Sequence, residues 1–455
     1  EGLHDETWLA AHTVGWPELR ARLAEYPPAR VAAITGLPEA DIVKLARLYA
    51  TTQPALIKIA DGLQRHLNGG QTIRAICALP ALTGQYGRRG GGLAYSASGY
   101  LQWDSAALNK WAECPPPARW VNMNRLGAAL LGEVSDPPIQ SLFVFGSNPA
   151  AIAPNAGQVI AGLQREDLFT VVHELFMTDT AVYADIILPA TSQLEHADLH
   201  KAYGHTVLAY NAPAIPPLGE SKSNWEVMGL LAREMGFDEA WLYQSADEVI
   251  EDVLRATAVT HAALADVTLE RLKTDGSIEL HHEPSVPFAD GRFPTASGKV
   301  ELFSQPLADL GLDPLPGYVA AEDDGRNDGR FAPADALNLI TGAAHHFVTS
   351  SFANQPGLLA REGEPFVEMH PDDAAARGIA PGDRVVVENG RGWCELKAIV
   401  TDGVRPGVLA SPKGRWSWLG NGRNVNWTTP DALGDMAGQS TFHSNRVWLR
   451  KASGG

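Results

Sequence analysis

The chain has 455 residues, which is too many for a single hydrophobic core, so two or more domains are expected. Hydrophobic residues make up 45% and charged residues 20%, as in soluble globular proteins, and no window holds the roughly 18 consecutive apolar residues of a membrane helix. The formal charge of −17 argues against a nucleic-acid backbone as the main partner, although backbone N–H groups could still hold a single nucleotide.

In the first quarter of the chain, the apolar pattern predicts two helices with a short strand between them. In segment 35–50, apolar residues recur at positions i, i+3, i+4 and i+7, and Pro38 suits the first turn of that helix. Segment 55–60 is short and apolar, as in a strand. A second helical pattern covers 71–82, with Pro80 as a kink or an end.

The segment 94–138 has weak periodicity and many Trp and Pro residues, so we expect it to be irregular. After it, short strands alternate with short helices, which predicts β-α-β units and a parallel sheet. The strands are "SLFVFG", "DLFTVV" and "DIILPA", and the helical segments are "NAGQVIAGL" and "DTAVYA".

Beyond an amphipathic helix at 224–235, the pattern is mixed up to 330, where "AAEDDGRNDGR" predicts an acidic linker. The last part then reads as five strands separated by Gly, Pro and Asp turns, interrupted only by the short helix "PDDAAARG". These strands predict a second, mostly β domain, which we expect to form a small barrel.

Polar residues follow each strand of the predicted parallel sheet. The first strand continues with Gly146, Ser147 and Asn148, the second with His173 and Glu174, and the third with "PATSQLEH". Because ligands bind beyond the carboxyl ends of parallel strands, this edge is a candidate nucleotide-like site, and the following helix would favour a phosphate. An ordinary α/β core with solvated loop ends remains the alternative.

Metal and catalytic motifs point to no site in this chain. His196 and His200 have the spacing of a zinc motif, but Ala197 occupies the position where zinc proteases carry Glu. In the adjacent histidine pairs at 281–282 and 345–346, the two side chains would point to opposite faces of a strand, so we expect neither pair to share a metal. The sequence has no G-x-S-x-G or G-x-G-x-x-G motif, so neither a catalytic residue nor a metal ligand is assigned.

Cysteine is scarce, and the three residues Cys77, Cys114 and Cys394 form no C-x-x-C motif. They cannot supply the four thiolates of an iron–sulfur cluster or a Cys-based zinc site. The sequence also starts at Glu1 without Met or a signal peptide, so we expect a fragment or a processed chain.

Several motifs resemble the molybdopterin oxidoreductases of the dimethyl-sulfoxide-reductase family, in the family's order, and with weaker upstream similarity the likeness extends from about Pro27 to Lys451. The motifs are "GSNPAAIAPN", "VVHELFMTDTAVYADIILPATSQLEH", "FPTASGKVELFS", "LNLITGAAHHFVTSSF", "MHPDDAAARGIAPGDRVVVENGRG" and "NVNWTTPDAL…TFHSNRV". The resemblance implies α/β, parallel-sheet, Rossmann-like pterin-binding domains followed by a C-terminal double-psi-type β-barrel. It also implies two molybdopterin guanine dinucleotides that chelate one molybdenum or tungsten.

The resemblance also implies site residues, all of them for cofactor binding. Asp61 and Arg65 would approach a pterin, and the barrel residues Asn426 and His443 would close the site. One dinucleotide would be lined by Asn148, His173, Glu174, His196 and Asn224. The loop from Thr341 to Ser350, with Thr341, Gly342, His345, His346, Thr349 and Ser350, would run along pyrophosphate and pterin.

The expected domains are an α/β molybdopterin oxidoreductase domain at 1–230, a connecting region at 231–330 and a dinucleotide-binding β-barrel at 331–455. The family's metal ligand and [4Fe-4S] cluster would belong to an N-terminal portion that this chain lacks, so the chain alone should be inactive.

The predicted function is two-electron oxygen-atom or hydride-type transfer on a small-molecule substrate. Expected partners are the missing N-terminal portion and an electron-transfer protein, without nucleic acid or a membrane span, in the cytoplasm. The alternative is a non-catalytic scaffold related to the large iron–sulfur subunit of respiratory complex I.

Overall fold

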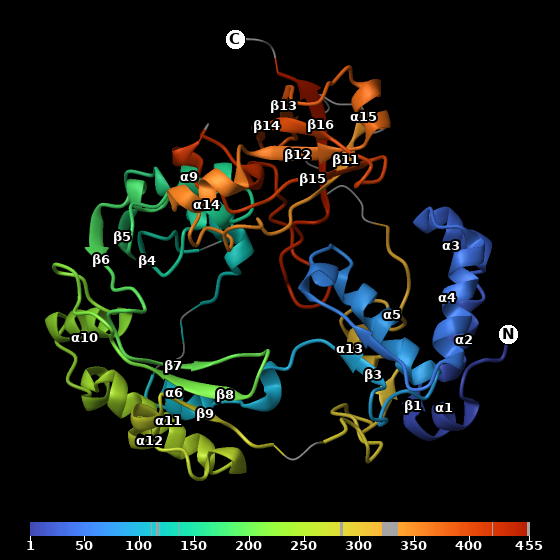
Figure 1. Ribbon diagram of the computed structural model, residues 1–455, viewed down its shortest axis with the longest axis horizontal. Helices are drawn as coiled ribbons and strands as arrows, with labels where there is room; N and C mark the ends of the chain where they lie inside the picture. Colours follow the sequence, from blue (N-terminus) through green and yellow to red (C-terminus); the bar gives the residue numbers. More distant parts are fainter. Residues whose placement is uncertain are drawn as a thin grey trace. The chain divides into compact units, whose positions relative to one another are not determined.

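The computed structural model describes residues 1–110, 112–114, 117, 119–134, 136–282, 285–320, 335–420 and 422–452. The chain forms two compact units, coloured along the sequence in Figure 1. Unit 1 comprises Glu1–Ala97, Glu283–Ala321 and Gly434–Gln439, and unit 2 comprises Ser98–His282, Glu322–Leu433 and Ser440–Gly455. Across the described residues, we find no helix with the length and apolar character that a membrane crossing requires.

Unit 1 is mainly helical, with two small parallel strand pairs, β1 with β10 and β2 with β3. Its helices are α1 (Glu6–His12), α2 (Trp16–Leu23), α3 (Pro28–Thr35), α4 (Glu39–Thr51), α5 (Gly69–Leu82) and α13 (Gln305–Asp309). Its strands are β1 (Thr13–Val14), β2 (Leu56–Lys58), β3 (Gly92–Ala94) and β10 (Val300–Glu301). The two predicted helices and the strand between them correspond to α4, α5 and β2, which confirms these predictions.

Two helices of unit 1, α4 and α5, have identifiable residues at their starts. Pro38 is the N-cap residue of α4, directly before the first turn in which the sequence analysis places it, and Pro80 lies inside α5, two residues before its end. At the start of α5, the Asp435 carboxylate accepts hydrogen bonds from the backbone N–H groups of Gly70 (2.8 Å) and Gln71 (3.0 Å). These donors lack partners within the helix, so Asp435 satisfies groups that would otherwise need water.

Unit 2 contains a parallel sheet of three strands, ordered β4-β5-β6. They are β4 (Ser141–Phe145), β5 (Phe169–Glu174) and β6 (Ile186–Pro189), connected through α8 (Pro149–Ile152), α9 (Ala156–Leu163) and a 3-10 turn at Ala181–Tyr183. Phe145 pairs with His173, and His173 with Leu188, so all three strands end at one edge, as predicted.

The two faces of this sheet differ. Leu142 packs into a core with α9 and α7 (Leu126–Leu130), and the next inward residues, Val144 and Val172, are also buried. The opposite face, by alternation of side chains, carries the large apolar residues Phe143, Phe145, Phe169, Val171 and Ile186, all partly or largely exposed.

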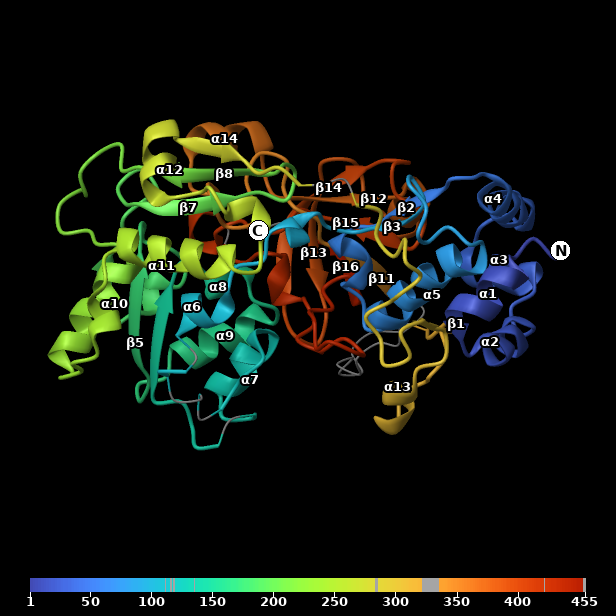
Figure 2. The ribbon, with the colours of Figure 1, turned by 90° about the horizontal axis from the view of Figure 1, so that it is seen from below.

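A second sheet of unit 2 is antiparallel, in the order β7-β8-β9, and was not predicted. Two helices contact it, and Figure 2 shows α12 beside β8. Leu208 of β8 packs in one core with Leu254 and Leu272 of these helices. The elements are β7 (Asp198–Lys201), β8 (Val207–Asn211), β9 (Ser277–Glu279), α11 (Ala246–Ala258) and α12 (Leu269–Asp275).

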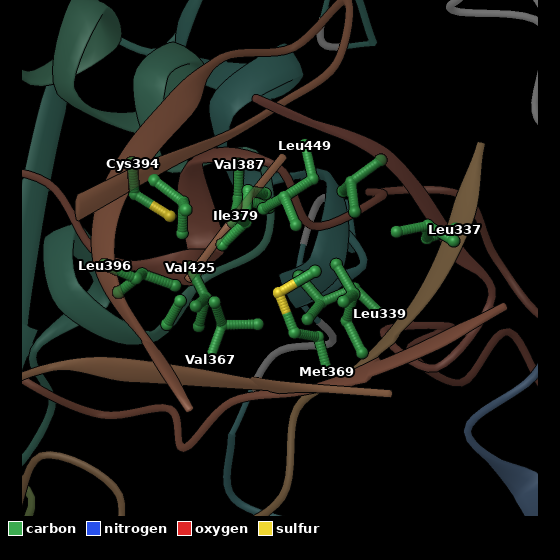
Figure 3. Packing of buried hydrophobic residues seen from close by; sticks show 14 of the residues in the cluster. Leu337, Leu339, Val367, Met369, Ile379, Val387, Cys394, Leu396, Val425 and Leu449 are labelled. Atoms are coloured by element: carbon green, nitrogen blue, oxygen red, sulfur yellow. The ribbon is translucent and has the colours of Figure 1, made fainter. Parts of the chain in front are cut away.

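The C-terminal part of unit 2 is a closed six-stranded barrel in the order β11-β15-β12-β14-β13-β16. Its strands are β11 (Leu337–Ile340), β12 (Phe366–Met369), β13 (Arg384–Glu388), β14 (Trp393–Val400), β15 (Val408–Ala410) and β16 (Asn445–Lys451). Side chains that alternate inward fill the interior, among them Leu339, Met369 and Cys394, each fully buried (Figure 3).

The predicted fold class, α/β with a parallel sheet followed by a β-barrel, agrees with this architecture at the level of mixed α/β and a closed barrel. Some details were wrong. The barrel has a sixth strand, β16, and a second helix, α14 (Pro356–Glu362), besides α15 (Pro371–Ala376). The stretch expected to be irregular contains α6 (Ser105–Asn109) and α7. Most of the predicted linker, from residue 321 onward, lies outside the described residues.

Candidate functional site

A cavity of about 1070 Å³ opens at the carboxyl ends of the parallel strands in unit 2. Its lining comes from the residue after β4, the end of β5, the loop after β6, α10 (Asn224–Glu234) and α11. Four predicted residues line it together, namely His173, Glu174, His196 and Asn224. The sequence analysis assigned these four residues to one site, and the structure places them in the lining of one cavity. Their role in cofactor binding stays a prediction.

His173 is the most buried of the four, with no exposed surface. Its Nε2 lies 3.1 Å from the carbonyl oxygen of Lys222, so this nitrogen donates when it carries the proton. Its Nδ1 is buried and has no hydrogen-bond partner among the described residues. A buried nitrogen at a cavity surface without a partner is suited to a ligand or a water molecule.

Glu174 is half-buried, and burial raises the pKa of its carboxyl group above the usual range. Its carboxylate accepts one hydrogen bond, from the backbone N–H of Leu175 at 2.8 Å. The neighbouring carboxylates Glu226 and Glu248 are engaged in the capping boxes of α10 and α11. Compared with Glu226 and Glu248, Glu174 thus keeps more acceptor capacity for a ligand.

His196 and Asn224 complete the predicted set. The Nδ1 of His196 lies 2.9 Å from the Thr191 hydroxyl, which orients the ring. Asn224 is exposed and forms the first residue of α10, directly after the N-cap residue Ser223. The positive end of this helix therefore lies at the cavity, where a negative group would be favoured.

Asn148 does not line this cavity, although it belongs to the same strand edge. It is 2% exposed, and its side-chain oxygen accepts hydrogen bonds from the backbone N–H (3.1 Å) and the hydroxyl (2.9 Å) of Thr180. Its Nδ2 lies 3.5 Å from Asp179, whose pKa is raised by burial. The amide thus holds the loop after β5 in place.

The loop from Thr341 to Ser350 follows β11 and is fixed by neighbours from the same barrel. The backbone N–H groups of His345 (3.4 Å) and His346 (3.0 Å) donate to Glu362, and Trp416 Nε1 donates to the Ser350 carbonyl at 2.8 Å. Thr341 is fully buried, and its hydroxyl has no partner among the described residues.

The end of the loop packs against a glycine that follows β15. Thr349 adopts a left-handed backbone with φ 50°. A Cβ atom on Gly414 would lie 2.1 Å from the Thr349 carbonyl oxygen, so a side chain there would push the loop away. Gly342, by contrast, is exposed with open space around it.

Asn426 joins the barrel to the parallel-sheet part of unit 2. Its Nδ2 and that of Asn424 both donate to the Ala151 carbonyl at 2.9 Å, and the Thr429 carbonyl accepts from the Asn155 N–H at 2.9 Å. Asn426 is 3% exposed, so its side chain is used within the protein. His443 is half-buried, with its ring 4.6 Å from that of Phe442.

Asp61 and Arg65 lie in unit 1, at a 3-10 turn after β2. Asp61 is exposed and accepts a hydrogen bond from the hydroxyl of Tyr95, which raises the pKa of that tyrosine. Arg65 is half-buried. The proposed pterin contact of both residues stays a prediction.

Sequence reasoning missed the aromatic and basic lining that α10 and its neighbours add to the cavity. Trp225, Arg233 and Tyr243 line it, and the guanidinium of Arg233 lies 5.1 Å from the Tyr243 ring. Two sequence motifs could have located this part of the lining. The capping boxes "SNWE" and "SADE" mark the starts of α10 and α11, which lie at the cavity.

Comparisons with known proteins agree with this architecture. The family model described as molybdopterin oxidoreductase matches residues 8–234, and the model described as molydopterin dinucleotide binding domain matches residues 337–446. The chain belongs to the molybdopterin oxidoreductase family. This confirms the resemblance found in the sequence, and the second match assigns a molybdopterin dinucleotide-binding domain to the barrel region.

The relatives that this chain matches are longer than the chain itself. The "Probable oxidoreductase YoaE" of Bacillus subtilis is 41% identical over 99% of this chain, which spans 64% of that relative. "Dimethyl sulfoxide reductase DmsA" of Escherichia coli is 27% identical over 93% of this chain, which spans 57% of it. The structure titled "Acetylene Hydratase from Pelobacter acetylenicus" has a TM-score of 0.77 at 24% identity, covering 99% of this chain and 68% of that one, and therefore supports the fold.

None of these similarities favours the alternative of a scaffold related to respiratory complex I.

Proposed function

We propose that the chain is the cofactor-binding part of an oxidoreductase that carries molybdenum or tungsten on two molybdopterin guanine dinucleotides. The two family models support this proposal most directly, because together they match most of the chain in the order of the family. The barrel, which mixes parallel and antiparallel pairs, would then be of the double-psi type. The domain boundaries near 230 and 330 are part of the same proposal.

The donor set of the cavity fits one such dinucleotide. Its volume is that of a small-molecule site, and the buried Nδ1 of His173 has no hydrogen-bond partner among the described residues. The carboxylate of Glu174 would accept from the adjacent N–H donors of a guanine edge, and the start of α10 at Asn224 would favour a phosphate. His196, oriented by Thr191, would contact the sugar or phosphate.

The remaining predicted residues would serve the same cofactor from other elements. The loop residues Thr341, Gly342 and Thr349 offer hydroxyl and open backbone groups, and His443 lies in the same barrel. For Asn148 and Asn426 we propose an indirect part, since both amides are bonded within the protein. The role of this chain is thus to bind and orient.

When bound, the metal and its pterins would supply two-electron oxygen-atom or hydride-type chemistry on a small substrate. The metal ligand, an iron–sulfur cluster and an electron-transfer partner would come from outside this chain, which spans 64% of the Bacillus relative. A cytoplasmic location is part of the proposal.

The test uses the full-length gene product. We expect molybdenum or tungsten by mass spectrometry, and twice as much guanine nucleotide as metal after acid release. Glu174→Gln should lower both contents, whereas Glu220→Gln, an exposed glutamate outside the cavity lining, should not. A full-length product with neither metal nor guanine would refute the proposed function.

A further inference from the structure

A second cavity, of about 530 Å³, lies at the barrel and shares no lining residue with the first. It is bordered by α14, the loop before β12, the start of β13 and the segment between β15 and the 3-10 turn at Val425–Trp427. Apolar side chains form part of its surface, including Leu359, Leu396 and Trp416. Three arginines also line it, namely Arg384, Arg415 and Arg423, together with one carboxylate, Glu364.

The one carboxylate among the described lining residues is already paired. Glu364 lies 3.3 Å from the guanidinium of Arg384 and 3.6 Å from the ammonium of Lys397. It is therefore shared by two cations and does not neutralise the other two arginines. The described part of the lining carries an excess of positive charge, in a chain whose net charge is −17.

Arg415 is half-buried, and burial lowers the pKa of its guanidinium. Its side chain donates to the carbonyl oxygen of Gly363, and within the described residues it forms no ion pair. The charge of Glu362 opposes this lowering of the pKa, and the oxygens of Glu362 already accept hydrogen bonds from the backbone N–H groups of His345 and His346. Arg415 is thus partly removed from water without a counterion.

Arg423 contacts two aromatic rings. Its guanidinium carbon lies 4.2 Å from the ring centre of Trp393 and 4.2 Å from that of Trp427. Such cation–π contacts restrict the side chain and leave the guanidinium N–H groups as donors. In the described part of the chain, no carboxylate or carbonyl group accepts from them.

A buried hydroxyl group also faces this cavity. Ser417 lines the cavity, is 8% exposed, and its Oγ is buried without a hydrogen-bond partner among the described residues. A buried hydroxyl without a partner is uncommon, because its desolvation is then uncompensated.

We propose that this cavity binds a small organic anion, with a carboxylate or phosphate group bonded to Arg415 and Arg423 and an apolar body against Leu359, Leu396 and Trp416. Guanidinium groups bind both kinds of oxyanion through paired N–H donors, and these bonds strengthen where water is partly excluded. Ser417 would donate or accept at the same group. The inference does not rest on the proposed function, because the two cavities have separate linings.

The test measures binding of three probes of similar size to the 455-residue chain by calorimetry: benzoate, phenyl phosphate and the neutral benzyl alcohol. We expect at least one anion to bind and the alcohol to bind at least about tenfold more weakly, since charge-assisted hydrogen bonds are lost. Which anion binds more tightly distinguishes a carboxylate ligand from a phosphate ligand.

Variants locate the binding. Arg423→Gln and Arg415→Gln should each weaken the binding of the anion by about tenfold or more. Arg405→Gln removes the same charge from an exposed position of the barrel outside the cavity and should leave binding unchanged. If Arg415→Gln does not fold, Arg415→Lys and Ser417→Ala replace it, with a smaller loss expected.

Equal binding of the neutral probe, or an equal loss in the Arg405 variant, would overturn the proposal. So would unchanged anion binding in the variants of Arg415 and Arg423, since the anion would then bind elsewhere.

Discussion

The barrel and the parallel sheet of unit 2 differ in how completely each buries its apolar residues. The barrel closes on itself, and residues such as Leu339 and Leu409 have no exposed surface. In the three-stranded sheet, helices pack against Leu142 on one face, while Phe145 and Phe169 on the other face are 50% and 49% exposed. Parallel sheets are normally covered on both faces. The barrel thus buries its apolar side chains within itself, whereas the sheet leaves its strand ends and one apolar face exposed.

The largest expected effect is in the barrel core. Leu339→Ala should lower the free energy of unfolding by about 2–5 kcal/mol, because it leaves a cavity among fully buried side chains. Ile186→Ala, on the open sheet face, should cost less than about 1 kcal/mol. Urea unfolding of both variants measures the difference. Equal losses would mean that the sheet face is buried in solution.

A glycine tests how tightly the barrel holds its loop. Gly414→Ala places a Cβ 2.1 Å from the Thr349 carbonyl oxygen and should cost about 2–4 kcal/mol, since the backbone must move. The matched control is Gly382→Ala, which has a similar φ of +88° but open space, so about 1–2 kcal/mol is expected from backbone strain alone. Thermal unfolding compares the two. A control that loses as much as Gly414→Ala would leave backbone conformation as the only cause.

At the sheet edge, Asn148→Leu should lower the free energy of unfolding by about 1–3 kcal/mol, because Thr180 and Asp179 lose a buried partner. Asn224→Ala, at an exposed position of the same edge, should change it by no more than about 0.5 kcal/mol. Denaturant unfolding of the unliganded chain gives both values. A neutral Asn148→Leu variant would show that the buried amide contributes nothing to stability.

The smallest expected effect depends on pH. Burial raises the pKa of Glu174, so the folded state binds its proton more tightly than the unfolded state does. Its contribution to stability is therefore present below the ordinary glutamate pKa and is lost as the pH rises through the raised pKa. Glu174→Gln should raise the melting temperature by a degree or two near neutral pH and leave it unchanged near pH 3. A variant less stable at neutral pH would contradict this sign.

Much of the fold follows from local patterns, and the failures have physical reasons. Strands β4, β5 and β6 were predictable because continuous apolar runs end at Gly or polar residues. The strand β16 was missed because its sequence, "NRVWLRK", mixes apolar and basic residues, which is the pattern of a strand with one face in the barrel and one outside.

The candidate site was predictable in part for similar reasons. His173 and Glu174 were found because a parallel sheet brings its strand ends together. The burial of Asn148 could not be foreseen, since its partners Thr180 and Asp179 come from a loop whose path depends on tertiary packing. The same holds for Asn426 and its acceptor Ala151, which are 275 residues apart.

The carboxylate of Asp435 at the start of α5 has a consequence for biosynthesis. Its two donors, on Gly70 and Gln71, precede it by 365 and 364 residues. A ribosome releases the chain from its N-terminus, so α5 emerges long before the residue that caps it. Although unit 1 begins the chain, it acquires this contact only after most of the barrel has been translated. A nascent chain that stalls before Gly434 would therefore hold α5 with its first N–H groups still dependent on water, even though the sequence of that helix is complete.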